Sequence, residues 1–378
     1  MTRAYQICVK CVMDTSDRDI KFNNEGICSH CQAYSHIAQY YENNDKIEGI
    51  RDRIIKKIRK DGHSKDYDCI IGVSGGVDSS YLAYIVKKLG LRPLAVHLDN
   101  GWDSELAVNN IEKLLKKLEI DLYTYVLDWE EFRDLQLAFL KSSTPDSEIP
   151  TDHAIVALLY NLARENDIKY IIIGTNYKTE SHLPRSWSQG HGDWVYINGI
   201  HKKFGKMELT TFPHYSPYVF LKNIAFGKPA FIPLLDYINY NKQTAMEILL
   251  KELEWKSYGG KHYESIYTKF YQGYILPKKF GFDKRRTHLS SLICSGEITR
   301  DNALKELEQQ PYTIQDQEND KDYVIKKLGI TNSDFEKIMK LPLKTYWDYP
   351  HSLIFNPLVF RIITTPLFIW NKISNSFY

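Results

Sequence analysis

The segment that most constrains the fold is a glycine turn between a strand-like and a helix-like stretch. Residues 67–73 read YDCIIGV and have the apolar character of a buried strand, and the turn SGGVDSS follows directly at 74–80. A helical pattern then continues over 81–89. Strand, glycine turn and helix in this order predict one unit of an α/β domain, with the turn at the end of the strand.

The alternation of strands and helices continues along the chain. Further strands are predicted at 94–98, 122–127, 170–174 and 230–234. Helices are predicted at 104–118, 130–141, 152–165 and 241–253. This alternation predicts a doubly wound α/β fold, in which right-handed crossovers join the strands of a parallel sheet. Between 175 and 227 we find no regular period, and a loop region of that length in a compact domain is usually functional.

Four cysteines precede the α/β pattern in two pairs. Cys8 and Cys11 form one C-x2-C pair and Cys28 and Cys31 the other, with sixteen residues between the pairs. This spacing is typical of a structural Zn²⁺ site, in which four thiolates fill the tetrahedral shell and leave no open position. An iron–sulfur cluster or four unrelated buried cysteines are the alternatives.

The regions that flank the α/β pattern suggest three parts of the chain. An amphipathic helix predicted at 46–60 links the cysteine segment to the first strand. Beyond the last α/β helix the chain is mostly helical, with candidates at 263–271, 289–295, 300–309 and 333–339. We therefore expect a zinc-binding module at 1–45, an α/β domain at 46–255 and a helical C-terminal region at 256–378 that contributes to the functional site.

Charge and hydropathy narrow the class of protein. The chain has 378 residues, and its 49 Lys and Arg against 47 Asp and Glu give a net charge of +2, so no overall field attracts nucleic acid and no nucleic-acid partner is expected. The first ten residues lack the apolar run of a signal peptide, which predicts a cytoplasmic protein with reduced cysteines. The apolar stretch at 353–373 is too interrupted for a transmembrane segment, and a docked tail or a peripheral membrane contact are the alternatives.

The turn at 74–80 has the chemistry of a phosphate site. Glycines let the backbone approach an anion closely, and the amides at the start of the next helix point toward it. The turn has no lysine, so it is not the usual P-loop for transfer of a γ-phosphate. Asp78 would repel bound phosphates unless a hard cation bridged them, which implies Mg²⁺. An ordinary Gly-Gly turn with a polar helix cap is the alternative.

The same turn resembles the PP-loop of the ATP pyrophosphatases, which include ammonia-dependent NAD synthetase, GMP synthetase and tRNA-thiolating enzymes. HLDNG at 97–101 and GTNYKTE at 174–180 agree with that family. The resemblance implies a PP-loop fold of the adenine nucleotide alpha-hydrolase type, which binds ATP, adenylates a substrate oxygen and releases pyrophosphate. It also implies Mg²⁺ on Asp78 and Glu180. The nucleotide-binding residues implied are Ser74, Gly75, Gly76, Val77, Asp78, Ser79, Ser80, Asp99, Gly174, Thr175 and Glu180.

A narrower resemblance covers nearly all of residues 5–350. The cysteine segment, the PP-loop, GTNYKTE and the string FYQGYILPKKFGFDKRRTHLSSLICSGEITRDNAL together are similar to the N-acetyl sugar amidotransferases of surface-polysaccharide and lipopolysaccharide (LPS) synthesis. The resemblance implies that ATP and ammonia convert the acetamido group of a nucleotide-activated sugar into an acetamidino group. It also implies partners, because a glutaminase and a cyclase-like subunit would supply the ammonia.

Charge neutralisation and positioning would carry such a reaction, without a covalent enzyme intermediate. We expect catalytic roles for Ser74, Asp78, Lys284 and Arg285. The last two belong to a dense basic cluster, whose members are Lys278, Lys279, Lys284, Arg285 and Arg286. A solvated charged loop is the alternative.

Rings and cations in the irregular stretch suit a sugar nucleotide, because rings stack on a sugar or base and Arg grips a phosphate. The candidates are His182, Arg185, Trp187, His191 and Trp194, and an ordinary surface loop with satisfied histidines is the alternative.

Two other functions remain open. A tRNA thiolase commonly needs further cysteines near the nucleotide, and only Cys69 and Cys294 remain for that role. Neither of these cysteines is presented in a nucleophile turn, so no glutaminase is recognised in the chain. A scaffold without catalysis is disfavoured by the intact acids Asp78, Asp99 and Glu180.

Overall fold

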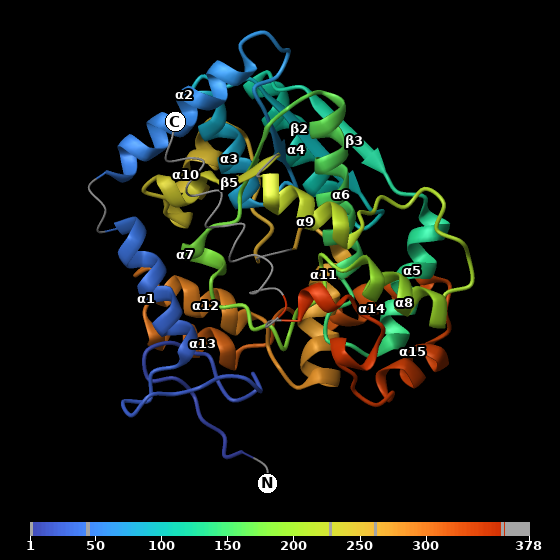
Figure 1. Ribbon diagram of the computed structural model, residues 1–378. Helices are drawn as coiled ribbons and strands as arrows, with labels where there is room; N and C mark the ends of the chain where they lie inside the picture. The colour runs from blue at the N-terminus through green and yellow to red at the C-terminus, as the bar shows by residue number, and fades with distance from the viewer. Residues whose placement is uncertain (1–2, 43–45, 227–228, 261–262, 357–358, 360–378) are drawn as a thin grey trace.

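The computed structural model describes residues 3–42, 46–226, 229–260, 263–356 and 359. Within these residues a parallel sheet of five strands lies in the order β3-β2-β1-β4-β5 (Figure 1). The strands are β1 (Cys69–Gly72), β2 (Pro93–Asp99), β3 (Leu122–Val126), β4 (Tyr170–Ile173) and β5 (Ala230–Pro233). The sheet therefore grows outward in both directions from β1, and the predicted doubly wound fold is confirmed.

Helices cover both faces of the sheet because successive strand residues point to opposite sides. Ile71 of β1 packs in one core with Leu82 of α3 (Val77–Lys88), and α4 (Glu105–Leu118) and α10 (Lys242–Glu252) share that core. Ile70 packs in the other core with Leu158 of α6 (Ile149–Glu165). Both isoleucines are fully buried, so β1 is the centre of the fold.

The irregular stretch at 175–227 is more ordered than the sequence suggests. It contains three helices, which are α7 (Tyr177–Glu180), α8 (Trp194–Phe204) and α9 (Pro217–Phe226). The expectation of a loop region was wrong here. Asp193 caps α8 by accepting hydrogen bonds from the amides of Val195 and Tyr196, and the buried residues of this helix are mostly aromatic or isolated aliphatic ones. A short helix of this composition has little periodic signal.

The C-terminal region is helical, as predicted. Its elements are α11 (Ile266–Phe270), the π-helix η2 (Tyr271–Phe280), α12 (Arg285–Cys294), α13 (Arg300–Glu308), α14 (Ile314–Leu328) and α15 (Asn332–Met339). In Figure 1 α11, α14 and α15 lie at the lower right with α5 (Trp129–Ser142) and α8, whereas α12 and α13 lie at the lower left. The apolar stretch predicted at 353–373 falls mostly outside the described residues, and its first part forms a short 3-10 turn, η4 (Leu353–Phe355). Among the residues that are described, no helix combines the length and the apolar character needed to cross a membrane.

The cysteine segment lies against the C-terminal helices, although the two are far apart in the sequence. In Figure 1 this segment and α1 (Ser29–Glu42) lie beside α12 and α13. Arg286 donates to the Val12 carbonyl at 2.6 Å, and the Ser290 hydroxyl accepts from the Val12 amide at 3.2 Å. Arg300 donates to the carbonyls of Cys8 and Cys11, each at 3.0 Å. Backbone polar groups of the first segment are thus satisfied by the last helices.

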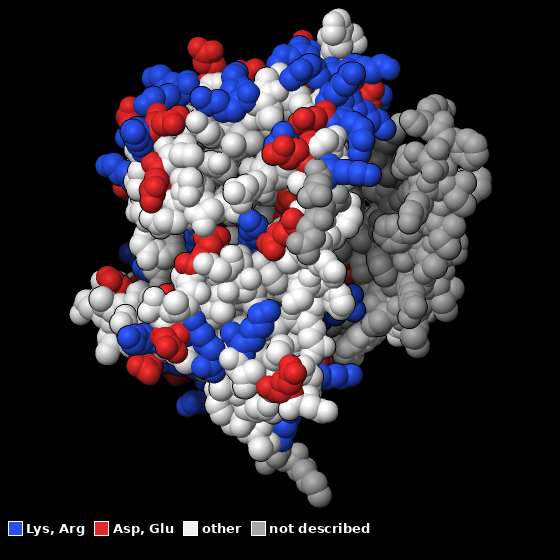
Figure 2. Space-filling model, turned by 90° about the vertical axis from the view of Figure 1, so that its left-hand side faces the viewer, with Lys and Arg blue, Asp and Glu red and all other residues white. Residues whose placement is uncertain are grey.

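Charge is unevenly distributed on the surface. On the face shown in Figure 2, Lys and Arg side chains gather at the upper end, whereas both signs mix elsewhere. The helix α2 (Ile47–Gly62) belongs to the upper part of the molecule and exposes Arg53, Lys56 and Lys57. The helix therefore carries a local basic surface on a chain of almost neutral net charge.

Candidate functional site

The glycine loop, residues 74–76, lies at the carboxyl end of β1. The order in which the chain adds strands to the sheet reverses between β1 and β4. Open α/β sheets bind ligands at such a point. Gly75 has φ +79°, and a Cβ on it would lie 2.8 Å from the Tyr258 hydroxyl and 3.0 Å from the Ala107 carbonyl. Only glycine fits this position. The Gly75 carbonyl accepts hydrogen bonds from Trp255 Nε1 at 2.8 Å and Tyr258 Oη at 2.9 Å, which fix the loop.

Two serines close the loop onto the helix that follows it. The hydroxyls of Ser74 and Ser79 are 3.1 Å apart, and Ser79 Oγ accepts from the Ser74 amide at 3.2 Å. In the described structure α3 starts at an N-cap glycine, Gly76, which has no side chain to cap the first amides. An uncapped helix start whose amides face a cavity is a ready anion site.

Carboxylates gather beside this helix start. Tyr240, which is 1% exposed, donates a hydrogen bond to Asp78 Oδ1. Burial raises the pKa of Tyr240, and the neighbouring charges of Asp78, Glu297 and Glu180 raise it further. Burial also raises the pKa of Asp236 to about 6, and the Glu180 carboxylate adds to that rise. This concentration of negative charge suits a divalent cation.

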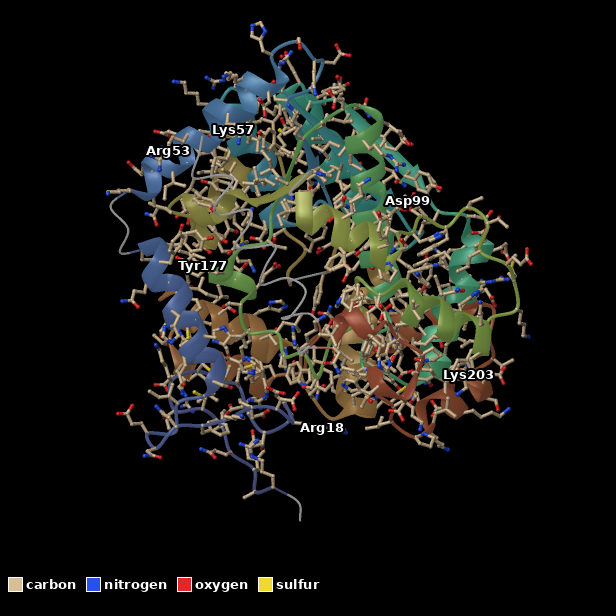
Figure 3. All side chains as sticks on the ribbon, viewed as in Figure 1. Arg18, Arg53, Lys57, Asp99, Tyr177 and Lys203 are labelled. Carbon is tan, nitrogen blue, oxygen red and sulfur yellow. The ribbon has the colours of Figure 1, made fainter. Side chains whose placement is uncertain are left out.

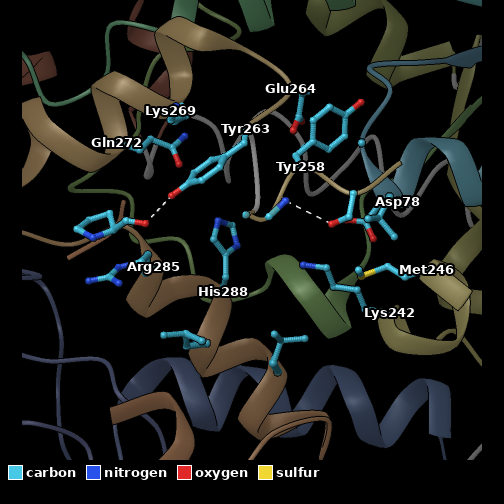
Figure 4. Close-up of a pocket in the computed structure, with 18 of the residues that line it drawn as sticks. Asp78, Lys242, Met246, Tyr258, Tyr263, Glu264, Lys269, Gln272, Arg285 and His288 are labelled. Carbon is cyan, nitrogen blue, oxygen red and sulfur yellow. Dashed lines mark hydrogen bonds between the residues drawn. The ribbon is translucent and has the colours of Figure 1, made fainter. Parts of the chain in front are cut away.

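The main cavity, of about 730 Å³, opens between the glycine loop and the C-terminal helices. Asp78 and Lys242 line one side and Gln272 and Arg285 the opposite side, while His288 of α12 projects between them (Figure 4). Glu180, at the end of α7, and Thr175 also line it. Most of the predicted residues of the turn and of GTNYKTE therefore meet at one cavity, but Gly75 and the fully buried Ser80 do not line it.

A second cavity, of about 380 Å³, lies over the ends of β1, β2 and β4. Ser74, Ser79 and Gly174 line both cavities, so the two meet at the glycine loop. His97 lies on its wall, with Nδ1 3.0 Å from the Val73 carbonyl and Nε2 3.0 Å from Asp103 Oδ2. Burial lowers the pKa of His97, but the contact with Asp103 outweighs burial and leaves this pKa raised.

The far wall of the second cavity carries buried charges. Asp146 is 5% exposed and accepts from the Glu148 amide at 2.9 Å and from the Ser188 hydroxyl. Burial alone would raise the pKa of Asp146, but His191 and the charge of Lys284 lower it to about 2. Burial raises the pKa of Glu148, which accepts hydrogen bonds from α11 and η2. This wall therefore has both signs of charge at fixed positions.

The basic cluster expected at 278–286 is divided in the structure. Arg285 reaches the main cavity, but its guanidinium is held by Asp283 Oδ2 at 2.7 Å and by the carbonyls of Glu306 and Gln309 at 3.0 and 2.9 Å. Lys284 lines the second cavity instead. The two predicted catalytic cations thus serve different cavities.

The other three cations lie away from both cavities. Lys278 lies over the Tyr274 ring, 3.8 Å from its centroid, and Arg286 binds the cysteine segment. Lys279 donates to the Ile338 carbonyl, and burial lowers its pKa to about 8. The expectation of one phosphate-binding cluster was wrong, because a π-helix and a turn into α12 send neighbouring side chains in different directions.

Asp99 does not line either cavity. Its carboxylate accepts from the Gly101 amide at 2.7 Å and so shapes the turn after β2. Figure 3 shows it far from Tyr177, which belongs to the GTNYKTE segment. Its neighbours His97, Leu98 and Asn100 line the second cavity, so these residues of HLDNG reach a cavity and the predicted nucleotide-binding residue Asp99 does not.

The rings and cations of 182–194 do not form one sugar site. His191 lines the second cavity, but Trp187 stacks on Phe282 with ring centroids 4.1 Å apart and is buried. Trp194 stacks on His214 at 4.1 Å, and Arg185 lines a separate cavity. This prediction was wrong because the helix α8 and the preceding turns point these side chains apart.

The four cysteines converge, as predicted. Cys8, Cys11, Cys28 and Cys31 are fully buried, and their sulfur atoms lie within 4.8 Å of one another. Backbone amides donate to three of the sulfurs, from Cys11 to Cys8 Sγ, from Cys31 to Cys28 Sγ and from Met13 to Cys11 Sγ, each at 3.4 Å. Such contacts stabilise thiolates, so the donor set fits a thiophilic metal ion. His30 lies outside this cluster, bound to Asp17 at 2.8 Å.

Several residues at the site carry no local sequence signal. Tyr240 supports Asp78, Trp255 and Tyr258 fix Gly75, and the Glu264 carboxylate would lie 3.2 Å from a Cβ on Gly76. They stand between 160 and 190 residues from the turn that they contact. A single sequence contains no feature that links them to it.

Two family models match the chain in succession. The model described as NAD synthase matches residues 46–205. The model described as "LPS biosynthesis protein WbpG-like, C-terminal domain" matches residues 264–361. The chain combines a PP-loop α/β domain with a WbpG-like C-terminal domain. The α/β domain implies ATP and usually Mg²⁺, and supports an ATP-using enzyme of the ligase type.

Individual relatives match less than half of this chain. An uncharacterized protein from Methanocaldococcus jannaschii is 28% identical over 171 residues, which are 44% of this chain and 58% of that protein. The tRNA(Ile)-lysidine synthase of Chlamydia trachomatis serovar D is 26% identical over 157 residues, 41% of this chain and 44% of the synthase. The chain thus spans about half the length of these relatives. The solved structure of NMN synthetase from Francisella tularensis aligns with 80% of this chain and 99% of its own, at 14% identity and a TM-score of 0.29.

Proposed function

We propose that this protein is an ATP-dependent amidotransferase that converts the acetamido group of an N-acetylated nucleotide sugar into an acetamidino group, for surface-polysaccharide synthesis. One observation carries the proposal. The glycine loop and Asp78 face a cavity whose other wall is the region that matches an LPS-biosynthesis domain. This arrangement supports an ATP site and a polysaccharide substrate site that share one cavity.

The two cavities suit the two large substrates. The phosphates of ATP would lie on the uncapped amides of α3, with adenosine in the second cavity beside His97 and Leu98. The acceptor would occupy the main cavity, which at about 730 Å³ is the larger and lies within the usual range for ligand sites. The acetamido oxygen can then approach the α-phosphorus at the glycine loop, where the cavities meet.

The chemistry needs two displacements. The acetamido oxygen attacks the α-phosphorus of ATP, the bond to the β-phosphate oxygen breaks, and pyrophosphate leaves. Ammonia then attacks the carbon of the resulting imidate, loses protons to solvent, and expels AMP together with the former acetamido oxygen. The helix amides beside Gly76, and Lys242 on the same side of the cavity as Asp78, would stabilise negative charge on the phosphates.

Two metal ions belong to this proposal. Asp78 and Glu180 would hold Mg²⁺, which would offset the charge between their carboxylates and the phosphates. The four cysteines would hold a structural Zn²⁺, since four thiolates leave no open position for chemistry.

The nitrogen would come from outside this chain. Within the described residues, neither Cys69 nor Cys294 lines the main or the second cavity, so neither can serve there as a glutaminase nucleophile or a sulfur carrier. Cys69 is fully buried in β1, and burial raises the pKa of its thiol. We therefore propose partners of the glutaminase and cyclase-like types that deliver ammonia directly to the main cavity.

Product analysis with an isotopic label tests the reaction. The purified protein is incubated with ATP, Mg²⁺, an ammonium salt and a UDP-linked N-acetylated sugar whose acetamido oxygen is ¹⁸O. We expect AMP and pyrophosphate in equal amounts, the label in AMP, and a sugar product in which nitrogen replaces oxygen. Glutamine should replace ammonium only when the partner subunits are added.

Asp78→Asn should lose turnover, because it removes a charge needed to bridge the phosphates through Mg²⁺. Asp66→Asn is the matched control, since Asp66 is an exposed carboxylate outside both cavities and should keep full turnover. ADP and phosphate as products would contradict the proposal. Modification of added tRNA in place of the sugar would instead favour the activity named for the lysidine synthase relatives.

A further inference from the structure

A second group of metal-ligand side chains lies beside the four-cysteine cluster. It consists of Cys31, His182 and Cys294, whose ligand atoms lie within 4.8 Å of one another. Cys31 belongs to both groups. The three residues come from the start of α1, from the turn after α7 and from the end of α12. The chain therefore folds to bring them together.

The distances within this group are those of ligands on one tetrahedral ion. Cys31 Sγ lies 3.6 Å from Cys294 Sγ and 3.9 Å from His182 Nε2, and Cys294 Sγ lies 3.6 Å from His182 Nε2. Ligands about 2.0 to 2.3 Å from a tetrahedral Zn²⁺ lie about 3.5 to 3.8 Å from one another. All three distances between ligand atoms agree with those around such an ion to within a few tenths of an ångström.

The environment of His182 prepares its Nε2 to bind a metal ion. The ring is fully buried, and its Nδ1 lies 3.0 Å from Ser291 Oγ. The Ser291 hydroxyl donates to the Thr287 carbonyl at 3.0 Å, and Ser181 Oγ lies 3.1 Å from the same Nδ1, so both hydroxyl oxygens can accept a hydrogen bond from Nδ1. With the ring proton on Nδ1, where two hydroxyl oxygens can accept it, the lone pair of Nε2 points at the two sulfurs. Metal-bound histidines are held in this way by a partner on the other nitrogen.

We propose that the protein binds a second Zn²⁺ through Cys31, His182 and Cys294, with the Cys31 thiolate bridging it to the ion of the four-cysteine site. Three protein ligands leave one position for water, which the partly exposed Cys294 side of the group can admit. A second divalent ion also reduces the excess negative charge that four thiolates leave around one ion in a buried site. No step of the proposed amidotransfer depends on this second ion.

The second ion would connect three parts of the chain, which are the segment after α7, the end of α12 and the cysteine segment. His182 lies two residues after Glu180, and Cys294 ends the helix that carries Arg285 and His288 into the main cavity. Cys31 connects both to the cysteine segment. The ion would therefore act as a positioning element for Glu180 and α12 rather than as a reactant.

Metal analysis tests the proposal on the full chain. Protein purified anaerobically with a thiol reductant, then dialysed against a weak chelator, should contain about two Zn²⁺ per chain. Cys294→Ala and His182→Gln should each reduce this to about one. The matched controls are Cys69→Ala, a buried cysteine in β1, and His36→Gln, an exposed histidine on α1, and both should keep two.

Cobalt substitution tests the bridge. Two Co²⁺ ions that share a thiolate couple magnetically, so the wild-type protein should show a weakened electron paramagnetic resonance signal per ion. Cys294→Ala should restore the signal of a single isolated ion. One Zn²⁺ in both the wild type and Cys294→Ala would overturn the second site and leave the four-cysteine site intact. Absence of metal from the wild type would overturn both.

Discussion

Gly75 shows how one residue determines the shape of the phosphate site. Its positive φ and the nearby Tyr258 hydroxyl both exclude a side chain. Gly75→Ala should lower the free energy of unfolding by about 1 to 3 kcal/mol and also raise the KM for ATP, because the loop must move away from Tyr258. Chemical denaturation and steady-state kinetics measure the two effects.

A second glycine allows the effect of backbone strain to be measured in the absence of a steric clash. Gly281 has φ +74°, but a Cβ on it meets nothing within 4 Å. Gly281→Ala should show the cost of the backbone conformation alone and leave the KM for ATP unchanged. An equal rise in KM in both variants would contradict the role given to the contact with Tyr258.

The residues of the turn could be predicted because their chemistry is local. The seven-residue turn at 74–80 contains Ser74, Gly75, Gly76 and Asp78. These residue types alone predict both the anion site and the need for a cation. The residues that hold the turn in place could not be predicted. Tyr240 and Tyr258 are ordinary tyrosines in a chain that has 27, and only the fold brings them to Asp78 and Gly75.

At the scale of elements, Arg285 connects the start of α12 to the end of α13. Its guanidinium satisfies the carbonyls of Glu306 and Gln309 while it is paired with Asp283. Arg285→Gln should therefore lower the free energy of unfolding by about 2 kcal/mol, because charged hydrogen bonds to those carbonyls are lost. Urea denaturation measures this change.

Arg53→Gln, on the exposed face of α2, is the matched control and should leave the unfolding midpoint unchanged (Figure 3). If Arg285→Gln instead keeps full stability and loses most of kcat/KM, this result would support the phosphate-binding role that the sequence predicts for Arg285.

The elements themselves were predicted to different degrees. The five strands lie within two residues of the predicted positions, because each is a short apolar run bounded by turn residues. Helix α14 was missed: it has few apolar positions, and Val324, Ile325 and Leu328 form only a narrow buried stripe. The basic cluster was misjudged for another reason. Closeness in sequence does not imply closeness in space where a π-helix such as η2 ends and a new helix begins.

The stability of the whole molecule should depend on pH through the ion pair of the partly exposed His191 with the buried Asp146 at the second cavity. The contacts with Asp146 and Asp152 raise the pKa of His191 above its usual range, although burial alone would lower it. A raised histidine pKa stabilises the fold fully below the unfolded-state value of about 6.5, and this contribution is lost as the pH rises further. Asp146, whose pKa is lowered to about 2, loses its contribution as the pH falls below about 4.

The stability difference between the wild type and His191→Gln should thus be largest between about pH 4 and 6.5 and shrink toward pH 9. Thermal unfolding across this range measures it. His36→Gln, exposed on α1, should show no such profile. A difference that grows with rising pH would contradict the pairing.

The contacts between the cysteine segment and the last helices set an order of events during synthesis. The carbonyl of Val12 is satisfied by a residue 274 positions later, and that of Cys8 by one 292 positions later. A ribosome releases residues in chain order, so Arg286 and Arg300 emerge long after the backbone groups that they bind. Contacts of such high sequence separation form late. The part of the protein that is made early is therefore among the last to acquire its native neighbours.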